Sequence, residues 1–195
     1  MDILAISKLN KGGIKMKKVK IALMGLGNVG RGVWMILNSN KEEIMKRSGY
    51  EVDVAKILVR DLEKDRYVDV PKELLTTDFN EIINDDSIKI VVEVMGGIEP
   101  AREYILESMK RKKHIVTANK MLLATGGDEL FEKADSEGVM FNYEASVAGG
   151  IPIIMTLVMP IYRKPCSGYW LDYGVFHNAP PKVLLLFSAP CRKTY

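Results

Sequence analysis

The sequence is poor in cysteine, and its cysteines do not have the spacing of a zinc site or a disulfide framework. Its 195 residues include only Cys166 and Cys191, which lie near the C-terminus without C-x-x-C spacing. Cysteines in this arrangement indicate neither a zinc site nor a disulfide framework. We therefore expect a protein of the reducing cytoplasm.

Long apolar runs and a strong charge of one sign are also missing. The run from Val183 to Phe187 is far shorter than the roughly 18 apolar residues of a membrane span, and residues 1–17 lack the layout of an export signal. The formal net charge of +3 is too small to favour nucleic acid, and the basic run 110–113 is typical of a solvated helix end. We expect neither a membrane nor a nucleic-acid partner.

The sequence does contain a glycine turn in an informative context. An apolar strand from Val19 runs directly into Gly25-Leu-Gly27-Asn-Val-Gly30, and helical periodicity follows from Val29 to Ser48. In a dinucleotide site the first glycine permits the tight turn, the second lets backbone amides approach a pyrophosphate, and the third lets the helix pack closely on the sheet. A glycine cluster with a purely structural role is the alternative.

Strand and helix patterns alternate along the rest of the chain as far as about residue 145. Further strands are predicted at 52–59, 88–95, 114–118 and 139–144, and further helices start at Asp78, at Pro100 and around Asp128. This alternation predicts an α/β protein with a doubly wound parallel Rossmann sheet and helices on both faces. Glu93, inside an apolar strand, must find a partner or lie near the ligand.

Two pairs of residues follow predicted strands at their carboxyl ends, where open α/β sheets bind ligands. Arg60-Asp61 stands where the adenosine ribose is read: an acid there favours NAD, and an arginine can hold the 2′-phosphate of NADP. Because Arg60 comes first, we favour NADP, the alternative being two solvated loop charges. Asn119-Lys120 follows the strand 114–118.

Three motifs together make the chain resemble the cofactor-binding domain of homoserine dehydrogenase. They are the glycine turn, Val116-Thr-Ala-Asn-Lys120, and Glu144-Ala-Ser-Val-Ala-Gly-Gly-Ile-Pro152. The resemblance covers roughly residues 18–155. It implies NAD(P)H-dependent interconversion of aspartate 4-semialdehyde and homoserine, on the route to threonine and methionine. It also implies a small-molecule substrate and, for the full-length family, a homodimer.

The resemblance also assigns roles by position. Lys120 would be catalytic and would also bind cofactor, beside the nicotinamide and the substrate. The other cofactor-binding residues would be Gly25, Gly27, Asn28, Val29 and Gly30 at the pyrophosphate, Arg60 at the ribose, and Met95 and Gly96 at the nicotinamide. A monovalent cation such as sodium would be held by oxygen atoms, largely backbone carbonyls, of Glu144, Val147, Gly149 and Ile151. A hinge between domains is the other reading of this last segment.

The chain departs from the family after about Ile154. We divide it into an N-terminal extension (1–17), a dinucleotide-binding domain (18–148), and a hinge with a truncated or divergent substrate-domain remnant (149–195). The family's N-G-T-x-N-Y-I-L stretch and second lysine are not found in this last part, and the abrupt change suggests a shifted reading frame. We therefore expect this chain alone to be inactive. A non-catalytic dinucleotide-binding module and a relative such as aspartate dehydrogenase are the alternatives.

Overall fold

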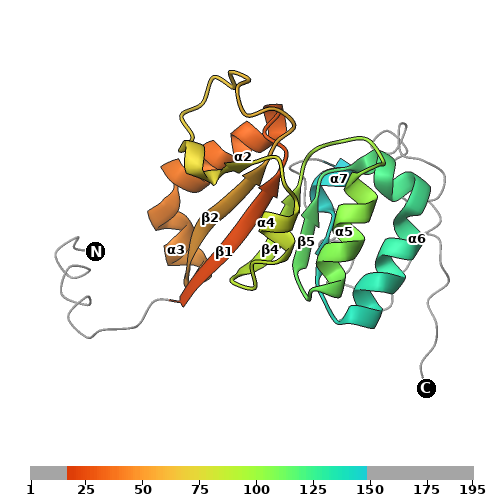
Figure 1. The fold of residues 1–195 in the computed structure, drawn as a ribbon. Coiled ribbons are helices and arrows are strands. Elements are labelled where there is room, and N and C mark those ends of the chain that lie inside the picture. The colour runs from red at the N-terminus through yellow and green to blue at the C-terminus, as the bar shows by residue number, and fades with distance from the viewer. Residues whose placement is uncertain (1–16, 149–195) are drawn as a thin grey trace.

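The computed structural model describes residues 17–148, and these form one parallel six-stranded sheet covered by helices on both faces (Figure 1). The strand order is β3-β2-β1-β4-β5-β6, and every pairing is parallel. The strands are β1 (Lys17–Met24), β2 (Tyr50–Leu58), β3 (Leu75–Thr76), β4 (Ile88–Glu93), β5 (His114–Thr117) and β6 (Phe141–Asn142). The predicted doubly wound Rossmann sheet is confirmed.

The helices divide between the two faces. Side chains of α2 pack on one face, and those of α4, α5 and α6 pack on the other. Their bounds are α2 (Asn28–Ser39), α3 (Lys41–Ser48), α4 (Asn80–Ile83), α5 (Ala101–Lys110), α6 (Lys120–Glu137) and α7 (Glu144–Ala148), with a 3₁₀ turn, η2, at Lys72–Leu74. Among the described residues, no helix is long and apolar enough to cross a membrane.

Strand β1 lies at the centre of the sheet and supplies both cores. Ile21 and Leu23 point into the core beneath α2, whereas Ala22 and Met24 point into the core beneath α5 and α6. All four are at most 4% exposed. The strand is therefore apolar without alternation, as expected when both faces of a parallel sheet are covered.

Two predicted helices have different bounds in the structure, and each contains a local break in the helical backbone. The stretch predicted as one helix from Val29 to Ser48 is two helices, because Asn40 leaves the helical region at φ −113° and ψ 23°. Ser39 and Asn40 favour such breaks, since their side chains compete for backbone hydrogen bonds. Helix α6 begins at Lys120, well before Asp128, and bends at Gly126, where φ is −144°.

The helix start predicted at Asp78, where Asp78 and Glu81 have the spacing of a capping box, is also different in the structure. Asp78 does accept a hydrogen bond from the Asn80 backbone N–H at 2.8 Å. Glu81, however, accepts from the Thr76 hydroxyl at 2.7 Å and pairs with Lys56 at 2.6 Å, so it does not bond back to Asp78. The tertiary neighbours from β2 and β3 outcompete the local reciprocal bond.

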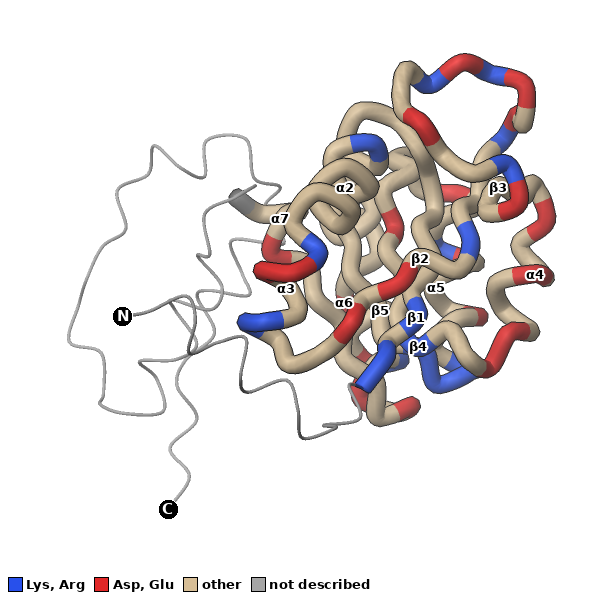
Figure 2. Tube along the Cα trace, turned by 90° about the vertical axis from the view of Figure 1, so that its left-hand side faces the viewer, with Lys and Arg blue, Asp and Glu red and all other residues tan. Residues whose placement is uncertain are grey.

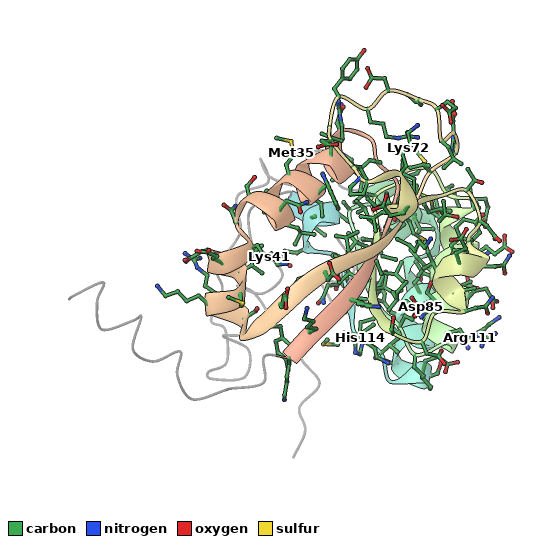
Figure 3. The ribbon with its side chains drawn as sticks, turned by 60° about the vertical axis from the view of Figure 1, so that its left-hand side comes forward. Met35, Lys41, Lys72, Asp85, Arg111 and His114 are labelled. Atoms are coloured by element: carbon green, nitrogen blue, oxygen red, sulfur yellow. The ribbon has the colours of Figure 1, made fainter. Side chains whose placement is uncertain are left out.

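The basic run 110–113 contains one residue for which the solvated reading is wrong. Lys113 is only 2% exposed, and its ammonium donates to the carbonyls of Asp85 at 2.6 Å and Ile88 at 3.1 Å. Burial lowers the pKa of Lys113 below its usual value. Figure 3 places Asp85 at the end of the sheet opposite Met35 and Lys72. Lys113 therefore ties the start of β5 to the turn before β4.

Replacing Lys113 by methionine should destabilise the protein by about 1–3 kcal/mol, because the apolar stem stays while a buried donor is lost. Urea unfolding of the chain at pH 7 measures the effect. Lys110→Met is the matched control, since Lys110 is exposed and pairs only with Glu107 on its own helix. Equal stability of the two variants would show that the buried hydrogen bonds contribute nothing.

Candidate functional site

The first glycine of the turn adopts a backbone conformation with positive φ, which residues with a side chain rarely adopt. Gly25 has φ +105°, and a Cβ there would lie 2.9 Å from the Val94 carbonyl oxygen. Its N–H donates to the Leu58 carbonyl at 2.9 Å, and the Val94 N–H donates to Met24 at 2.9 Å. The turn is thus pinned between the carboxyl ends of β2 and β4, which is the point where the strand order reverses.

The third glycine sets how closely helix α2 approaches this turn. A Cβ on Gly30 would lie 2.2 Å from the Gly25 carbonyl oxygen, far inside any real contact. Gly30 is the buried residue of α2. The helix therefore begins directly over the carboxyl end of β1, as the glycine spacing predicts.

The middle glycine faces open space. Gly27 is the N-cap residue of α2, and no side chain forms a capping hydrogen bond there. A Cβ at Gly27 would have no other atom within 4 Å. The first helical turn contains no acidic residue, and the first backbone N–H groups of a helix have no partner within it. A phosphate group fits this cradle, where N–H groups and the helix dipole favour an anion.

The carboxylate of Glu93 organises the ends of β4 and β5. It is completely buried and accepts hydrogen bonds from the Thr117 hydroxyl at 2.6 Å, the Met95 N–H at 2.8 Å and the Gly96 N–H at 3.3 Å. The expectation that Glu93 needs a partner is therefore confirmed. These bonds fix the backbone of Met95 and of Gly96, which has φ +75°.

Asn119 connects the same strand ends to helix α6. Its side chain accepts from the Leu122 N–H at 3.1 Å as an N-cap and donates to the Gly97 carbonyl at 2.6 Å. Its own N–H donates to the Thr117 hydroxyl at 3.0 Å. Asn119 was predicted at the ligand-binding end of this strand without a role, and Thr117 was not predicted in the site. A polar residue directly before a helix is, however, a recognisable capping signal.

Lys120 is the first residue of α6 and is exposed at the carboxyl end of β5. It follows Asn119, whose backbone is held by the bonds to Thr117 and Gly97. The lysine therefore stands at the same edge of the sheet as Met95, Gly96 and the glycine turn. The structure brings these predicted residues to one edge.

Arg60 lies at this edge as well, two residues beyond the end of β2. Its side chain is exposed and makes no hydrogen bond or ion pair with another residue of the described range 17–148. The neighbouring Asp61 accepts from the Glu63 N–H at 2.9 Å. Since Gly25 is bonded to Leu58, the loop carrying Arg60 leaves the sheet beside the glycine turn.

The predicted cation-binding segment is only partly described. Glu144 and Val147 belong to the short helix α7, which is attached to β5 because the Ser146 hydroxyl donates to the Thr117 carbonyl at 2.9 Å. Gly149 and Ile151 lie outside the described residues, as do Cys166 and Cys191. Within residues 17–148, no three His, Cys, Asp or Glu side chains cluster as metal ligands.

Comparison with known proteins gives the same assignment along most of the described chain. Residues 25–144 match the family described as homoserine dehydrogenase, NAD binding domain. The chain is 46% identical over 142 residues to homoserine dehydrogenase of Bacillus subtilis and 48% identical over 141 residues to that of Synechocystis, covering 73% and 71% of this chain. It spans only about a third of their length, 33% and 32%.

A solved structure agrees with these sequence relatives. The crystal structure of a homoserine dehydrogenase from Thiobacillus denitrificans superposes with a TM-score of 0.70 at 44% identity, covering 75% of this chain and 34% of that one. The matched region is an NAD-binding domain, so the cofactor is a nicotinamide dinucleotide, NAD or NADP. The chain belongs to the homoserine dehydrogenase family, of which residues 25–144 are the NAD-binding domain.

Proposed function

We propose that this chain is the NADP-binding part of an enzyme that interconverts aspartate 4-semialdehyde and homoserine. The observation that carries the proposal is the single edge of the sheet where the open Gly27 cradle, Arg60 and Lys120 come together. Because the chain spans about a third of its curated relatives, the activity of the whole enzyme belongs to this proposal.

The glycine turn and the first turn of α2 hold the pyrophosphate. Gly25 and Gly30 shape the turn, and Gly27 leaves the space that the phosphates enter. The backbone N–H groups of Asn28, Val29 and Gly30 then donate to phosphate oxygens, helped by the dipole of α2. None of these contacts needs a charged side chain.

Arg60 binds the 2′-phosphate and makes the chain selective for NADP over NAD. An unpaired, exposed guanidinium offers several donors in the planar fork that suits phosphate oxygens. Asp61 is the residue that would instead bind a ribose 2′-hydroxyl, but its carboxylate already accepts from the Glu63 N–H within the loop. One oxygen of Asp61 is thus directed into the loop, whereas the Arg60 guanidinium has no partner within residues 17–148, which favours the arginine for binding the 2′-phosphate.

Lys120 acts on the substrate from the nicotinamide side of the site. When bound, the dinucleotide supplies or accepts hydride through its nicotinamide ring. Met95 and Gly96, fixed by the buried Glu93 carboxylate, border the ring and limit its position. The Lys120 ammonium faces the substrate oxygen and stabilises the negative charge that develops on it.

A monovalent cation, sodium in this proposal, is held after β6 by oxygen atoms of Glu144, Val147, Gly149 and Ile151. The support from the described part is that Glu144 and Val147 lie on the short helix α7, which is attached to β5 through Ser146. Hard cations take such oxygen ligands. The cation would stiffen the segment that follows the Ser146 anchor to β5.

Gly27→Val should reduce NADPH binding at least about tenfold, because the side chain would occupy the place of the phosphates. The fold should survive, since a Cβ at Gly27 meets nothing within 4 Å. Gly30→Ala should instead lower the free energy of unfolding by about 1–3 kcal/mol or more, as its Cβ would overlap the Gly25 carbonyl.

Calorimetric titration with NADPH and urea unfolding separate these two effects. Gly32→Ala is the control on the same helix, because a Cβ at Gly32 also has open space. It should bind NADPH normally and gain about 0.5–1 kcal/mol in stability. Normal NADPH binding by Gly27→Val would contradict the placement of the phosphates.

Arg60→Ala should weaken NADPH by about 1.5–3 kcal/mol and NADH much less, since the lost contact is a charge-assisted bond to the 2′-phosphate alone. Calorimetry with both cofactors gives the two changes. Arg47→Ala is a control of the same charge change on the distant helix α3. A uniform loss for both cofactors would make Arg60 a general steering charge.

Lys120 is tested in a chimera, in which residues 17–148 replace the matching part of the Bacillus subtilis enzyme. Homoserine-dependent reduction of NADP is expected, and Lys120→Ala should lower kcat about 10²–10³-fold, as for loss of one group that stabilises an oxyanion. Lys110→Ala should have no effect. A chimera that binds NADPH but stays inactive would favour a non-catalytic binding module.

A further inference from the structure

The loop that carries Arg60 has little apolar anchorage of its own. Between β2 and β3, Leu62 is 46% exposed and Tyr67 is 83% exposed. Figure 2 shows this loop as a lobe of alternating acidic and basic residues that projects from the body of the molecule. Val59 and Val70 pack with the core beneath α2 at the two ends of this loop, so the position of the exposed part between them depends on its hydrogen bonds.

The first part of the loop is folded onto itself. The Arg66 guanidinium donates to the carbonyl of Asp61, next to Arg60, and to that of Lys64 at 2.7 Å. The Asp61 carboxylate accepts from the Glu63 N–H at 2.9 Å. Residues 61–66 therefore behave as one bonded unit, and a shift of Arg66 displaces the start of the loop.

Two side chains of α2 attach this unit to the helix. Arg31 donates to the Arg66 carbonyl at 3.1 Å, and Trp34 donates from its indole nitrogen to the Asp69 carbonyl at 2.9 Å. Residues three apart lie on the same side of a helix, so both bonds pull the loop onto one face of α2. Arg31 also donates to the Asn28 side chain, inside the glycine turn.

A hollow of about 200 Å³ lies beneath the loop, between it and the glycine turn. Its apolar lining is Leu26 from the turn together with Leu62, Val68, Val70 and Leu75. The loop thus stands off the turn and is bridged to α2 by the bonds of Arg31 and Trp34. The chain just before Arg60 is held by backbone bonds of Leu58 and Val59, so the bonds of Arg31 and Trp34 hold the part of the loop that follows Arg60.

We infer that Arg31 and Trp34 are positioning residues that set the selectivity for NADP over NAD by holding the loop of Arg60 on helix α2. The inference rests on the proposed roles of Gly27 and Arg60. Arg31 and Trp34 act through the loop carbonyls and through Arg60. Removing the donor of Arg31 or Trp34 should therefore weaken the binding of the 2′-phosphate more than the binding of the pyrophosphate.

Trp34→Phe and Arg31→Met test the inference, because each keeps apolar packing and removes the donor. The readout is the ratio of Kd for NADH to Kd for NADPH, measured by calorimetry on the full chain, which a general loss of stability would leave unchanged. Each variant should lower this ratio about 3–10-fold, as expected for one lost hydrogen bond. Arg47→Met, with the same charge change on α3, should leave it unchanged.

A double-mutant cycle with Arg60→Ala then identifies the route. We call the two hydrogen bonds of Arg31 and Trp34 to the loop the clamp. If the clamp acts through Arg60, Trp34→Phe should no longer change the ratio of Kd values once the Arg60 side chain is removed. A wild-type chain that binds neither cofactor would overturn the proposed function and the clamp with it. A selective wild type with an unchanged ratio in both variants, or an equal effect of Trp34→Phe with and without Arg60, would overturn the clamp alone.

Discussion

The close approach of Gly30 to the Gly25 carbonyl sets where helix α2 begins at the ligand edge. Only a residue without a side chain can bring the first turn of α2 to this point, where a Cβ would lie 2.2 Å from the carbonyl oxygen. The approach places the free N–H groups of the helix beside the strand ends. Gly27, which has open space around it, then leaves this region free for a ligand.

The two halves of the site are held by different physics. On the side that we propose for the nicotinamide, the buried Glu93 carboxylate is stabilised by a hydroxyl and two backbone N–H groups, which joins β4 to β5 and fixes Met95 and Gly96. A buried carboxylate is costly unless it is fully bonded, so this half has one well-defined arrangement. The role that we propose for Lys120 depends on such a fixed frame.

On the side that we propose for the adenosine, the hydrogen bonds that support the loop are exposed or only partly buried. The loop after β2 is held by hydrogen bonds from Arg31 and Trp34 to its backbone carbonyls, and by its own Arg66. Individual bonds of this kind contribute about 0.5–1.5 kcal/mol. Trp34 also packs against the core beneath α2, so we propose that substitutions which remove only its donor, or that of Arg31, change the preference between the two cofactors at little cost to the core.

The sequence by itself determined the alternation of strands and helices, the parallel sheet, and the tight turn and close packing at the first and third glycines, although the short elements β3 and α7 were not predicted. These features follow from local periodicity and from steric rules that act within a few residues. It also placed Lys120 and Arg60 at strand ends, because each directly follows an apolar run. The break at Asn40 was not predicted, because helical apolar spacing continues through this residue. The start of α6 at Lys120 was not predicted, because glycines interrupt the helical pattern in its first turns.

Only the tertiary structure decided which polar groups meet. Lys113 lies in a basic run that suggests solvent, yet it is buried because β5 brings it under the carbonyls of Asp85 and Ile88. The bonds of Glu93 to Thr117 and of Arg31 to Arg66 join residues 24 and 35 positions apart. Local sequence patterns do not predict such pairs, because the pairs form only when the strands lie side by side.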